Sequence, residues 1–503
     1  MSRFLWLLSF LLALAAQAAP NNILLIIADD YGVDSSSLYN TNAGAVLPPT
    51  PNINSLAAQG MIFRDAYAYP VCSPTRACIL TGQYGFRTGV GDVIENSPAL
   101  STSLWTLPRA LNNAATGHVM AQFGKWHLGG GLNGPQNTGG WTHFSGSLFG
   151  ALANYTNWTK NVNGINMMNY TNYATSDVVD DALTWINAQA TNRWFAWVAF
   201  NAPHTPLHKP PTHLAPSYAS LPGTTTHIKN NPLLYYNAMV EAMDTEIGRL
   251  LAAVNLSNTC VIFVGDNGTP ENVLQPPYPS GHGKGSLYEG GTKVPLVVAG
   301  APVTSPGQTN GTPVHVVHLF ATILELAGTS ASAVAPTNVT LDSRSFASAL
   351  MGGTESDQLV YGEQFGTPAG TKDGRSLRDT RYKLIRLNDG HDEFYDLQTD
   401  PAELTDLNSV LTAEQRSYRD RLQFWLYGYT TNSGVNVTAP AAGAGQFSCT
   451  LEQVGNYELW RCDDLTAQFW SPVTHAIATT NGTTMTLTDP FAPAEHGFYS
   501  VIK

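Results

Sequence analysis

Residues 22–30 read NILLIIADD, a continuous apolar run that ends in two aspartates. A run of this length without polar alternation is typical of a strand buried on both faces of a sheet. Similar apolar runs occupy residues 118–123, 194–201, 260–265 and 295–299. Helical patterns lie between these runs, at residues 55–60, 106–113 and 235–254. Alternation of this kind predicts an α/β sandwich around a mainly parallel sheet flanked by helices.

The pattern changes near residue 359, where short antiparallel strands are predicted over 359–365, 376–388 and 392–398, with a helix over 412–425. The 503 residues also exceed what one simple core usually holds. We therefore expect a large N-terminal domain and several smaller units. The large domain is expected over residues 20–357 and a C-terminal α+β subdomain over 358–430. A linker follows over 431–445, and a small β-rich appendage over 446–503.

The first 18 residues have the features of a secretory signal peptide. Arg3 precedes an apolar run over residues 4–16, and Ala16-Gln17-Ala18 forms a small-residue cleavage site. The run is too short to span a membrane. We therefore expect a periplasmic or secreted protein with no membrane span.

The composition limits the partners. The chain has 25 Lys and Arg against 37 Asp and Glu, which gives a net charge of -12. This balance argues against nucleic acid or an anionic membrane as a general partner, but it leaves an anionic small substrate open. The chain also has five cysteines, so in an oxidising compartment at least one is unpaired or chemically altered.

We predict how four of these cysteines behave. Cys449 and Cys462 flank a short segment of the appendage, and a disulfide there would stabilise a module with little core. Cys260 lies in a predicted core strand and Cys78 in a predicted helix, so both should stay reduced. Cys72 remains without a partner.

Two predicted strands end in polar pairs, Asp29-Asp30 and Asp266-Asn267. Functional groups gather at the carboxyl ends of strands in open α/β sheets. Carboxylate and amide oxygens suit Ca²⁺ or Mg²⁺ rather than zinc. Either pair alone is also ordinary strand-to-turn sequence.

The stretch around Cys72 predicts the start of a helix. Ser73 is expected as the N-cap and Pro74 at the first helical position. Cys72 then precedes the helix, where backbone N–H groups and the dipole favour negative charge. Arg76 lies in the first turn and can point back toward Cys72.

Cys72-x-Pro74-x-Arg76 followed by Leu80-Thr81-Gly82 resembles the signature of type I sulfatases, which belong to the alkaline phosphatase superfamily. The likeness extends in order from about residue 22 to about residue 407. Its other segments are Asp29-Asp30, Phe123-Gly124-Lys125-Trp126-His127-Leu128-Gly129, Pro203-His204, Asp266-Asn267-Gly268, Gly283-Lys284-Gly285, Tyr288-Glu289-Gly290-Gly291 and Tyr395-Asp396-Leu397 with Asp400-Pro401-Ala402-Glu403.

The resemblance implies the alkaline-phosphatase-like fold and hydrolysis of organic sulfate esters. In this family a formylglycine-generating or anaerobic maturation enzyme converts the motif cysteine, here Cys72, to formylglycine (3-oxoalanine). The aldehyde hydrates to a geminal diol, which attacks sulfur and forms a covalent sulfo-enzyme intermediate. Such a diol explains why Cys72 needs no disulfide partner.

The resemblance also assigns roles residue by residue. One Ca²⁺ would be held by Asp29, Asp30, Asp266, Asn267 and the residue derived from Cys72. Arg76, Lys125 and Lys284 would bind the nucleophile and the sulfate oxygens. His204 would protonate the leaving alcohol, shared with Lys284, and His127 would take the proton that triggers sulfate release.

Several alternatives stay open at this point. His208 and His282 lie close enough in sequence to compete for the acid or substrate-binding role, and Ser145 and Ser147 are both candidates for one further sulfate contact. Relatives with the same aldehyde chemistry cleave phosphodiesters or phosphonate monoesters. A third hypothesis is a non-catalytic, carbohydrate-binding relative. The presence of a suitable residue at every catalytic position argues against it. Aryl sulfates and sulfated sugars are both open as substrates.

Overall fold

A computed structural model describes residues 20–353, 359–370 and 372–430, together with the strands found between residues 447 and 502. A 10-stranded sheet in the order β11-β2-β10-β9-β1-β8-β4-β5-β6-β7 organises the N-terminal part. Its strands are β1 (Asn22–Ala28), β2 (Gly60–Phe63), β4 (His118–Gly124), β5 (His143–Gly146), β6 (Trp158–Val162), β7 (Ile165–Tyr170), β8 (Arg193–Ala199), β9 (Thr259–Gly265), β10 (Leu296–Gly300) and β11 (Gln308–Asn310).

The centre of the sheet is parallel, as the apolar runs predict. β1 pairs in parallel with β8 on one side and β9 on the other, so that Leu25 lies opposite both Trp197 and Ile262. β4 continues the parallel order beyond β8. β10, β6 and β7 form antiparallel pairs toward the two edges. The predicted mixed, mainly parallel sheet is confirmed.

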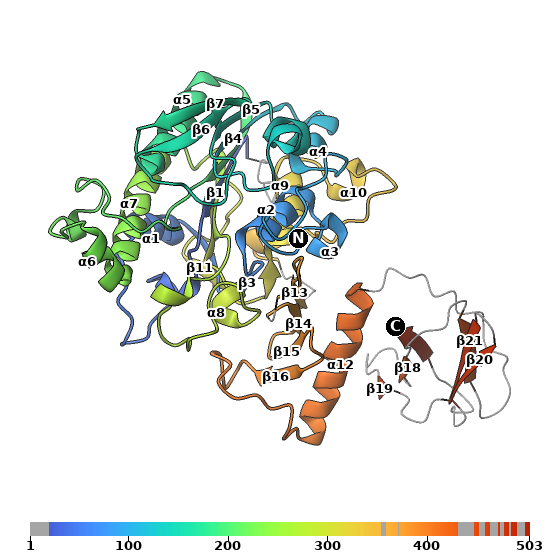
Figure 1. Cartoon of the computed structure of the whole chain (residues 1–503). Helices are drawn as coiled ribbons and strands as arrows, with labels where there is room; N and C mark the ends of the chain where they lie inside the picture. The colour runs from blue at the N-terminus through green and yellow to red at the C-terminus, as the bar shows by residue number, and fades with distance from the viewer. Residues whose placement is uncertain are drawn as a thin grey trace, which may run out of the picture.

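Both faces of the sheet are buried, and β1 shows why its sequence lacks polar alternation. Ile23 and Ile27 point into one core, and Leu24 and Ile26 point into the other. One face is covered by α2 (Cys72–Thr81), α4 (Leu107–Asn113) and α9 (Leu319–Leu326). The opposite face is covered by α1 (Pro51–Ala58), α5 (Ala174–Ala188) and α7 (Pro232–Ala252). Figure 1 shows the two helix layers on either side of β1.

Short elements connect these layers. They are β3 (Ala66–Tyr67), α3 (Gly85–Thr88), α6 (Thr225–Asn230), α8 (Glu289–Thr292), β12 (Val314–His315), α10 (Ala331–Val334) and α11 (Ala347–Leu350). Most predicted elements lie within a few residues of the observed ones. The helix expected over 235–254 begins earlier, because Pro232 occupies its first turn, where the missing N–H costs nothing.

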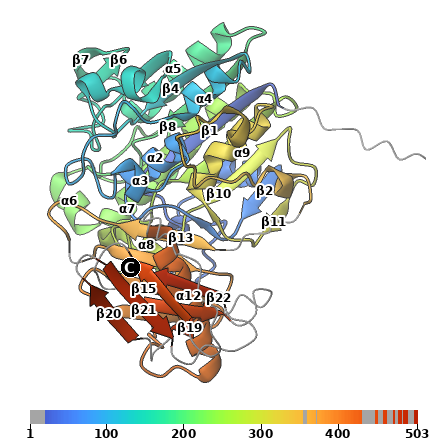
Figure 2. The ribbon, with the colours of Figure 1, turned by 90° about the vertical axis from the view of Figure 1, so that its right-hand side faces the viewer.

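A second, antiparallel sheet follows the main domain, and Figure 2 shows it beside α12. Its strands, in spatial as well as chain order, are β13 (Val360–Gln364), β14 (Gly374–Arg378), β15 (Tyr382–Leu387) and β16 (Asp392–Asp396). The helix α12 (Ala413–Thr430) packs on this sheet through Leu422 and Leu426. Both the strands and the closing helix are elements that the sequence predicts.

Two three-stranded sheets, β17-β21-β20 and β19-β18-β22, form the described part of the C-terminal region. Their strands are β17 (Phe447–Leu451), β18 (Glu458–Cys462), β19 (Ser471–Pro472), β20 (Ile477–Asn481), β21 (Thr484–Asp489) and β22 (Phe498–Ile502). Cys449 and Cys462 therefore lie on strands of different sheets, and their side chains fall outside what is described.

The proposed signal peptide over residues 1–18 also lies outside the described residues. Among the helices that are described, none has the length and apolar character needed to cross a bilayer.

Candidate active site

The polar residues that the sequence singles out meet at one edge of the large sheet. Because β1, β4, β8 and β9 run parallel, their carboxyl ends lie together. The residues that follow these strands are, in that order, Asp29 and Asp30, Lys125 and His127, His204, and Asp266 and Asn267. Contacts between them, and with residues of α2 and the loop before α8, join all ten candidate residues into one cluster.

Two of the carboxylates are paired with buried cations. Lys125 Nζ lies 2.6 Å from Asp29 Oδ2, with both side chains fully buried. Arg76 Nη2 lies 2.7 Å from Asp266 Oδ2, and its Nη1 donates to the carbonyl oxygen of Lys125. Buried charges need such partners, since an isolated one is strongly disfavoured away from water. Arg76 therefore crosslinks α2 to the ends of β4 and β9.

Asp30 is the centre of a second group. It forms an ion pair with Lys284, accepts a hydrogen bond from Asn267 Nδ2 at 2.8 Å, and has an oxygen 3.8 Å from His204 Nε2. Burial opposes ionisation, but Lys284 and His204 outweigh it and lower the pKa of Asp30. Its backbone has a φ of 68°, in the left-handed region that non-glycine residues rarely adopt. Strain of this kind persists where the surroundings fix a side chain in place.

Two oxygens in the cluster have no hydrogen-bond partner. Asp29 Oδ1 and Asn267 Oδ1 are buried and accept no hydrogen bond, although buried polar atoms are nearly always satisfied. Ligand atoms of Asp29, Cys72 and Asp266 lie within 4.8 Å of one another. Burial also raises the pKa of Asp29 to about 7, despite the opposing effect of Lys125. A hard cation would satisfy these oxygens, so the donor set fits Ca²⁺.

The start of α2 differs from the sequence prediction. The helix begins at Cys72, with Val71 as its N-cap, so Ser73 is not the capping residue. The Ser73 hydroxyl instead donates to the carbonyl oxygen of His127 at 3.0 Å and accepts from the Ile94 N–H at 3.2 Å. The serine is used to hold two loops against the helix, which a local capping rule does not anticipate.

Cys72 faces His127. Its Sγ lies 3.1 Å from His127 Nδ1. Burial opposes ionisation of the thiol, but Lys125 and His127 lower its pKa to about 6. His127 itself has a φ of 55°, and a Cβ on Gly150 would meet its ring at 2.3 Å. The imidazole is therefore closely confined beside residue 72.

The competing histidines lie elsewhere. His208 packs on Tyr155, with ring centroids 4.3 Å apart, and hydrogen-bonds to the Tyr173 hydroxyl; burial lowers its pKa to about 4. His282 stacks on Tyr288 at 3.7 Å. Only His204 of these histidines contacts the carboxylate cluster.

Neither serine candidate contacts the cluster through its side chain. Ser145 donates to Asp181 on α5, and the Ser147 hydroxyl bonds to the backbone of Phe149. Ser147 is linked to the site through its backbone. Its carbonyl oxygen accepts a hydrogen bond from the N–H of Trp126, the residue before His127.

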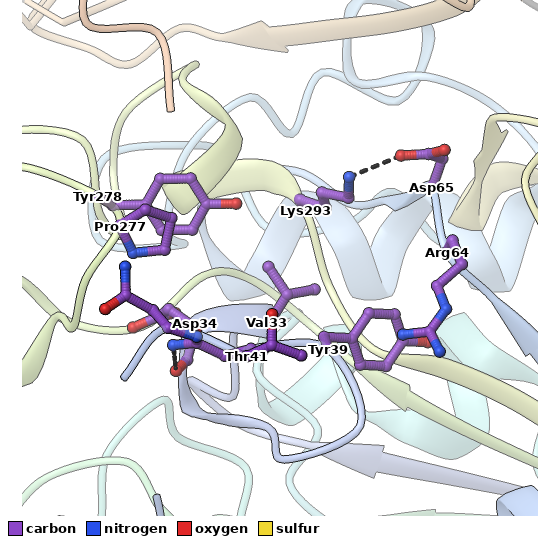
Figure 3. A pocket seen from close by; sticks show the side chains of 11 residues that line it. Val33, Asp34, Tyr39, Thr41, Arg64, Asp65, Pro277, Tyr278 and Lys293 are labelled. Atoms are coloured by element: carbon purple, nitrogen blue, oxygen red, sulfur yellow. Dashed lines mark hydrogen bonds and ion pairs between the residues drawn. The ribbon is translucent and has the colours of Figure 1, made fainter. Parts of the chain in front are cut away.

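A separate pocket of about 360 Å³, drawn in Figure 3, contains none of the ten candidates. Arg64, Asp65 and Lys293 lie on one side of it, with Lys293 Nζ 2.6 Å from Asp65 Oδ1. On the other side Asp34 accepts from Thr269 and from the N–H of Gln275. The polar groups there are therefore satisfied by contacts within the protein.

Sequence reasoning missed two residues of the site. Tyr155 has its hydroxyl 2.7 Å from the carbonyl oxygen of His204 and 2.6 Å from that of Asn201, which holds the loop after β8. Glu95 places an oxygen 3.3 Å from His127 Nε2. Both lie in loops whose sequences have no periodic or motif signal.

Comparisons with known proteins relate the chain to sulfatases. The sulfatase family model matches residues 21–329, and a model of the C-terminal part of N-sulphoglucosamine sulphohydrolase matches residues 282–432. N-acetylgalactosamine-6-sulfatase of Canis lupus familiaris is 28% identical over 389 residues, which are 70% of each chain. A sulfatase of Formosa agariphila is 27% identical and covers 82% of this chain and 90% of its own.

Solved structures share the fold. The chain matches Ps i-CgsB in complex with k-i-k-neocarrahexaose with a TM-score of 0.69 and 23% identity, covering 82% of this chain and 93% of that one. It matches BT4656 in complex with its substrate D-glucosamine-2-N,6-O-disulfate with a TM-score of 0.67 and 21% identity, covering 83% and 99%.

The family model spans well over half of the chain, so the chain belongs to the sulfatase family, in its type I branch within the alkaline phosphatase superfamily. It is a sulfuric ester hydrolase.

Proposed function

We propose that this sulfatase hydrolyses sulfate esters of carbohydrates through a formylglycine made from Cys72. The observation that carries the proposal is the position of Cys72. It is a buried cysteine at a helix N-terminus, in contact with His127 and surrounded by Arg76, Lys125 and Lys284. Nearby cations stabilise an anionic nucleophile, whereas a buried cysteine with a purely structural role does not need them.

The metal site we propose consists of Asp29, Asp30, Asp266, Asn267 and residue 72. The unpartnered oxygens of Asp29 and Asn267 support it. Three carboxylates close together repel one another, and here Arg76, Lys125 and Lys284 offset that repulsion. A bound Ca²⁺ would add further positive charge beside the nucleophile and the sulfate.

In the first step, one diol hydroxyl of residue 72 loses its proton to solvent, and the resulting oxyanion attacks sulfur as the bond from sulfur to the substrate oxygen breaks. Lys125 and Lys284 are positioned to bind sulfate oxygens as charge grows on them. His204 gives its proton to the departing alcohol. Its contact with Asp30 and the Tyr155 bridge to its backbone keep the ring at the cluster.

In the second step, the remaining diol hydroxyl gives its proton to His127. The carbon–oxygen bond to sulfate breaks, sulfate leaves, and the aldehyde is regenerated for hydration by water. The contact between His127 Nδ1 and the residue 72 side chain supports this role, because a general base must lie within hydrogen-bond reach of its proton.

A carbohydrate substrate is the class we favour over an aryl sulfate. The relatives with related sequences include N-acetylgalactosamine-6-sulfatases, and one similar structure holds a disulfated glucosamine. An arylsulfatase of Klebsiella aerogenes is also related, at 24% identity. Small aryl sulfates therefore serve as assay substrates in the tests below.

The test is a panel of sulfated mono- and oligosaccharides with one aryl sulfate and the matched aryl phosphate. We expect at least one sulfated sugar to give a higher kcat/KM than the aryl sulfate, and the phosphate to be turned over much less efficiently. If the phosphate ester were the better substrate, the phosphodiesterase or phosphonate hydrolase alternative would replace this proposal.

We also propose export to the periplasm or the medium, on the features of residues 1–18, and a maturation enzyme that oxidises Cys72. The domain boundaries at 357/358 and 430/431, the linker over 431–445 and the appendage from 446 to 503 remain predictions.

A further inference from the structure

Glu95 is an exposed residue that contacts a buried histidine of the site, His127. About 67% of its side chain is exposed, yet its Oε2 lies 3.3 Å from Nε2 of His127, whose own side chain is only 7% exposed. On the other side of the same ring, Nδ1 lies 3.1 Å from Cys72 Sγ. The three side chains form a line from the protein surface to the nucleophile position.

The loop that holds Glu95 is tied to the same anchor as His127. The Ile94 N–H donates to the Ser73 hydroxyl, and that hydroxyl donates to the carbonyl oxygen of His127. A second tie comes from the C-terminal subdomain, where the Thr367 N–H donates to the carbonyl oxygen of Asn96. The residues before and after Glu95 are therefore both held by hydrogen bonds. This fixes the position of Glu95 more firmly than is usual for an exposed side chain.

A histidine with a carboxylate at one nitrogen has a defined tautomer. A carboxylate only accepts hydrogen bonds, so the nitrogen facing Glu95 carries the hydrogen and the nitrogen facing residue 72 is free to accept. The hydrogen bond with His127 lowers the pKa of Glu95 to about 2, so the carboxylate stays ionised and accepting.

We propose that Glu95 is the positioning residue of His127: it holds the imidazole with Nε2–H outward and a bare Nδ1 toward residue 72. This rests on the proposed role of His127 in sulfate release. Glu95 then acts only in the second half of the cycle, because the first half uses His204 as its acid. It touches neither substrate nor sulfate.

The kinetic test compares Glu95→Ala, Glu95→Gln and the control Glu325→Ala, an exposed glutamate on α9. Slower sulfate release lowers kcat and KM together and leaves kcat/KM unchanged, because kcat/KM reports only the steps through sulfate transfer. We expect kcat of Glu95→Ala to fall by about tenfold or more, as for other residues that orient a histidine. Glu95→Gln, which keeps an acceptor, should lie closer to the wild type, and Glu325→Ala should match it.

A label on the sulfate tests the same step directly. After a quench during turnover with a ³⁵S-sulfate ester, more label should remain on the Glu95→Ala protein than on the wild type. A fall in kcat/KM, a change in KM alone, or no added label would overturn the proposal, since each places Glu95 at the substrate or outside the cycle.

A spectroscopic test does not depend on the proposed function. The protein used is Cys72→Ala with ¹⁵N-histidine at alkaline pH, because it has no thiolate facing Nδ1 and its imidazole rings are neutral. The His127 signal, assigned by its loss on adding His127→Gln, should report hydrogen on Nε2. Adding Glu95→Ala should weaken that tautomer preference. The opposite tautomer with Glu95 present, or the same spectrum after Glu95→Ala, would contradict the positioning role even if sulfatase activity were confirmed.

Discussion

The Sγ atom of Cys72 lies 3.1 Å from Nδ1 of His127. The two residues are 55 positions apart in the sequence, and they meet because α2 begins where β4 ends, at the same edge of the sheet. In the proposed cycle this contact serves only sulfate release. The enzyme should therefore remain able to take sulfate from a substrate when the imidazole is removed.

We predict that His127→Ala releases about one equivalent of alcohol per site and then stalls. Its steady-state kcat should fall by about a hundredfold or more, which is the usual contribution of a general base. Rapid-quench measurement of the released alcohol checks this. A steady rate without an initial burst would assign His127 to the first step instead.

His204 should matter in proportion to the basicity of the leaving group. An alkoxide from a sugar needs protonation as it departs, whereas a nitrophenolate needs little. His204→Ala should therefore lower kcat/KM much more for a sugar sulfate than for nitrophenyl sulfate. Equal losses on both substrates would mean that His204 binds sulfate or supports the site rather than acting as the acid. His391→Ala is the control and should match the wild type on both substrates, because His391 is an exposed histidine outside the cluster.

Calcium should stabilise the folded protein. A ligand that binds only the native state at 100 times its Kd adds about 2.7 kcal/mol to the free energy of unfolding. Because the unfolding entropy is about 2.1 cal/mol/K per residue, we expect the melting temperature of a domain of this size to rise by roughly 4 °C. Differential scanning calorimetry after chelation and after calcium addition measures it. In Asn267→Ala, which removes the unpartnered Oδ1, the shift should shrink sharply, whereas Glu325→Ala should keep it. A calcium-independent melting temperature in the wild type would exclude the site.

The cysteines outside the site give a separate prediction. Cys78 and Cys260 are both free and buried, as the sequence predicts. Cys449 and Cys462 should form a disulfide, contributing about 3 kcal/mol to the appendage. Peptide mapping without reductant should recover the two peptides as one crosslinked species. Recovery of both as free thiols from exported protein would show that the appendage is stabilised without it.

The fold was predictable from sequence where burial dictates the pattern. NILLIIA is predicted to be a strand covered on both faces because consecutive residues, such as Leu24 and Leu25, enter different cores. The edge hairpin β6–β7 has no such pattern: β7 is almost wholly exposed, with Ile165 and Met168 among its exposed apolar residues. Its position depends on pairing rather than on hydrophobic periodicity, so the sequence did not predict it.

The clustering of the candidate residues was predictable where a motif or a strand end fixes a residue. Asp29, Asp30, Asp266 and Asn267 follow buried strands, and the parallel order of those strands brings them together. Glu95 was not predictable, because its contact with His127 depends on a loop anchored through a serine.

The role of Ser73 was also not predictable from the local sequence. Its place before Pro74 favours a capping role, but its tertiary partners, Ile94 and His127, determine where its hydroxyl points. Capping rules consider only residues that are close in sequence, whereas both of these partners are distant in sequence.

The most direct test of the account is the chemical state of residue 72 in active enzyme. Mass spectrometry of the peptide that contains it, from protein made with a maturation enzyme, should find an aldehyde in place of the thiol. The aldehyde fraction should rise in step with specific activity, and Cys72→Ala should be inactive while still folded. Fully active enzyme in which that peptide carries only unmodified cysteine would contradict the account.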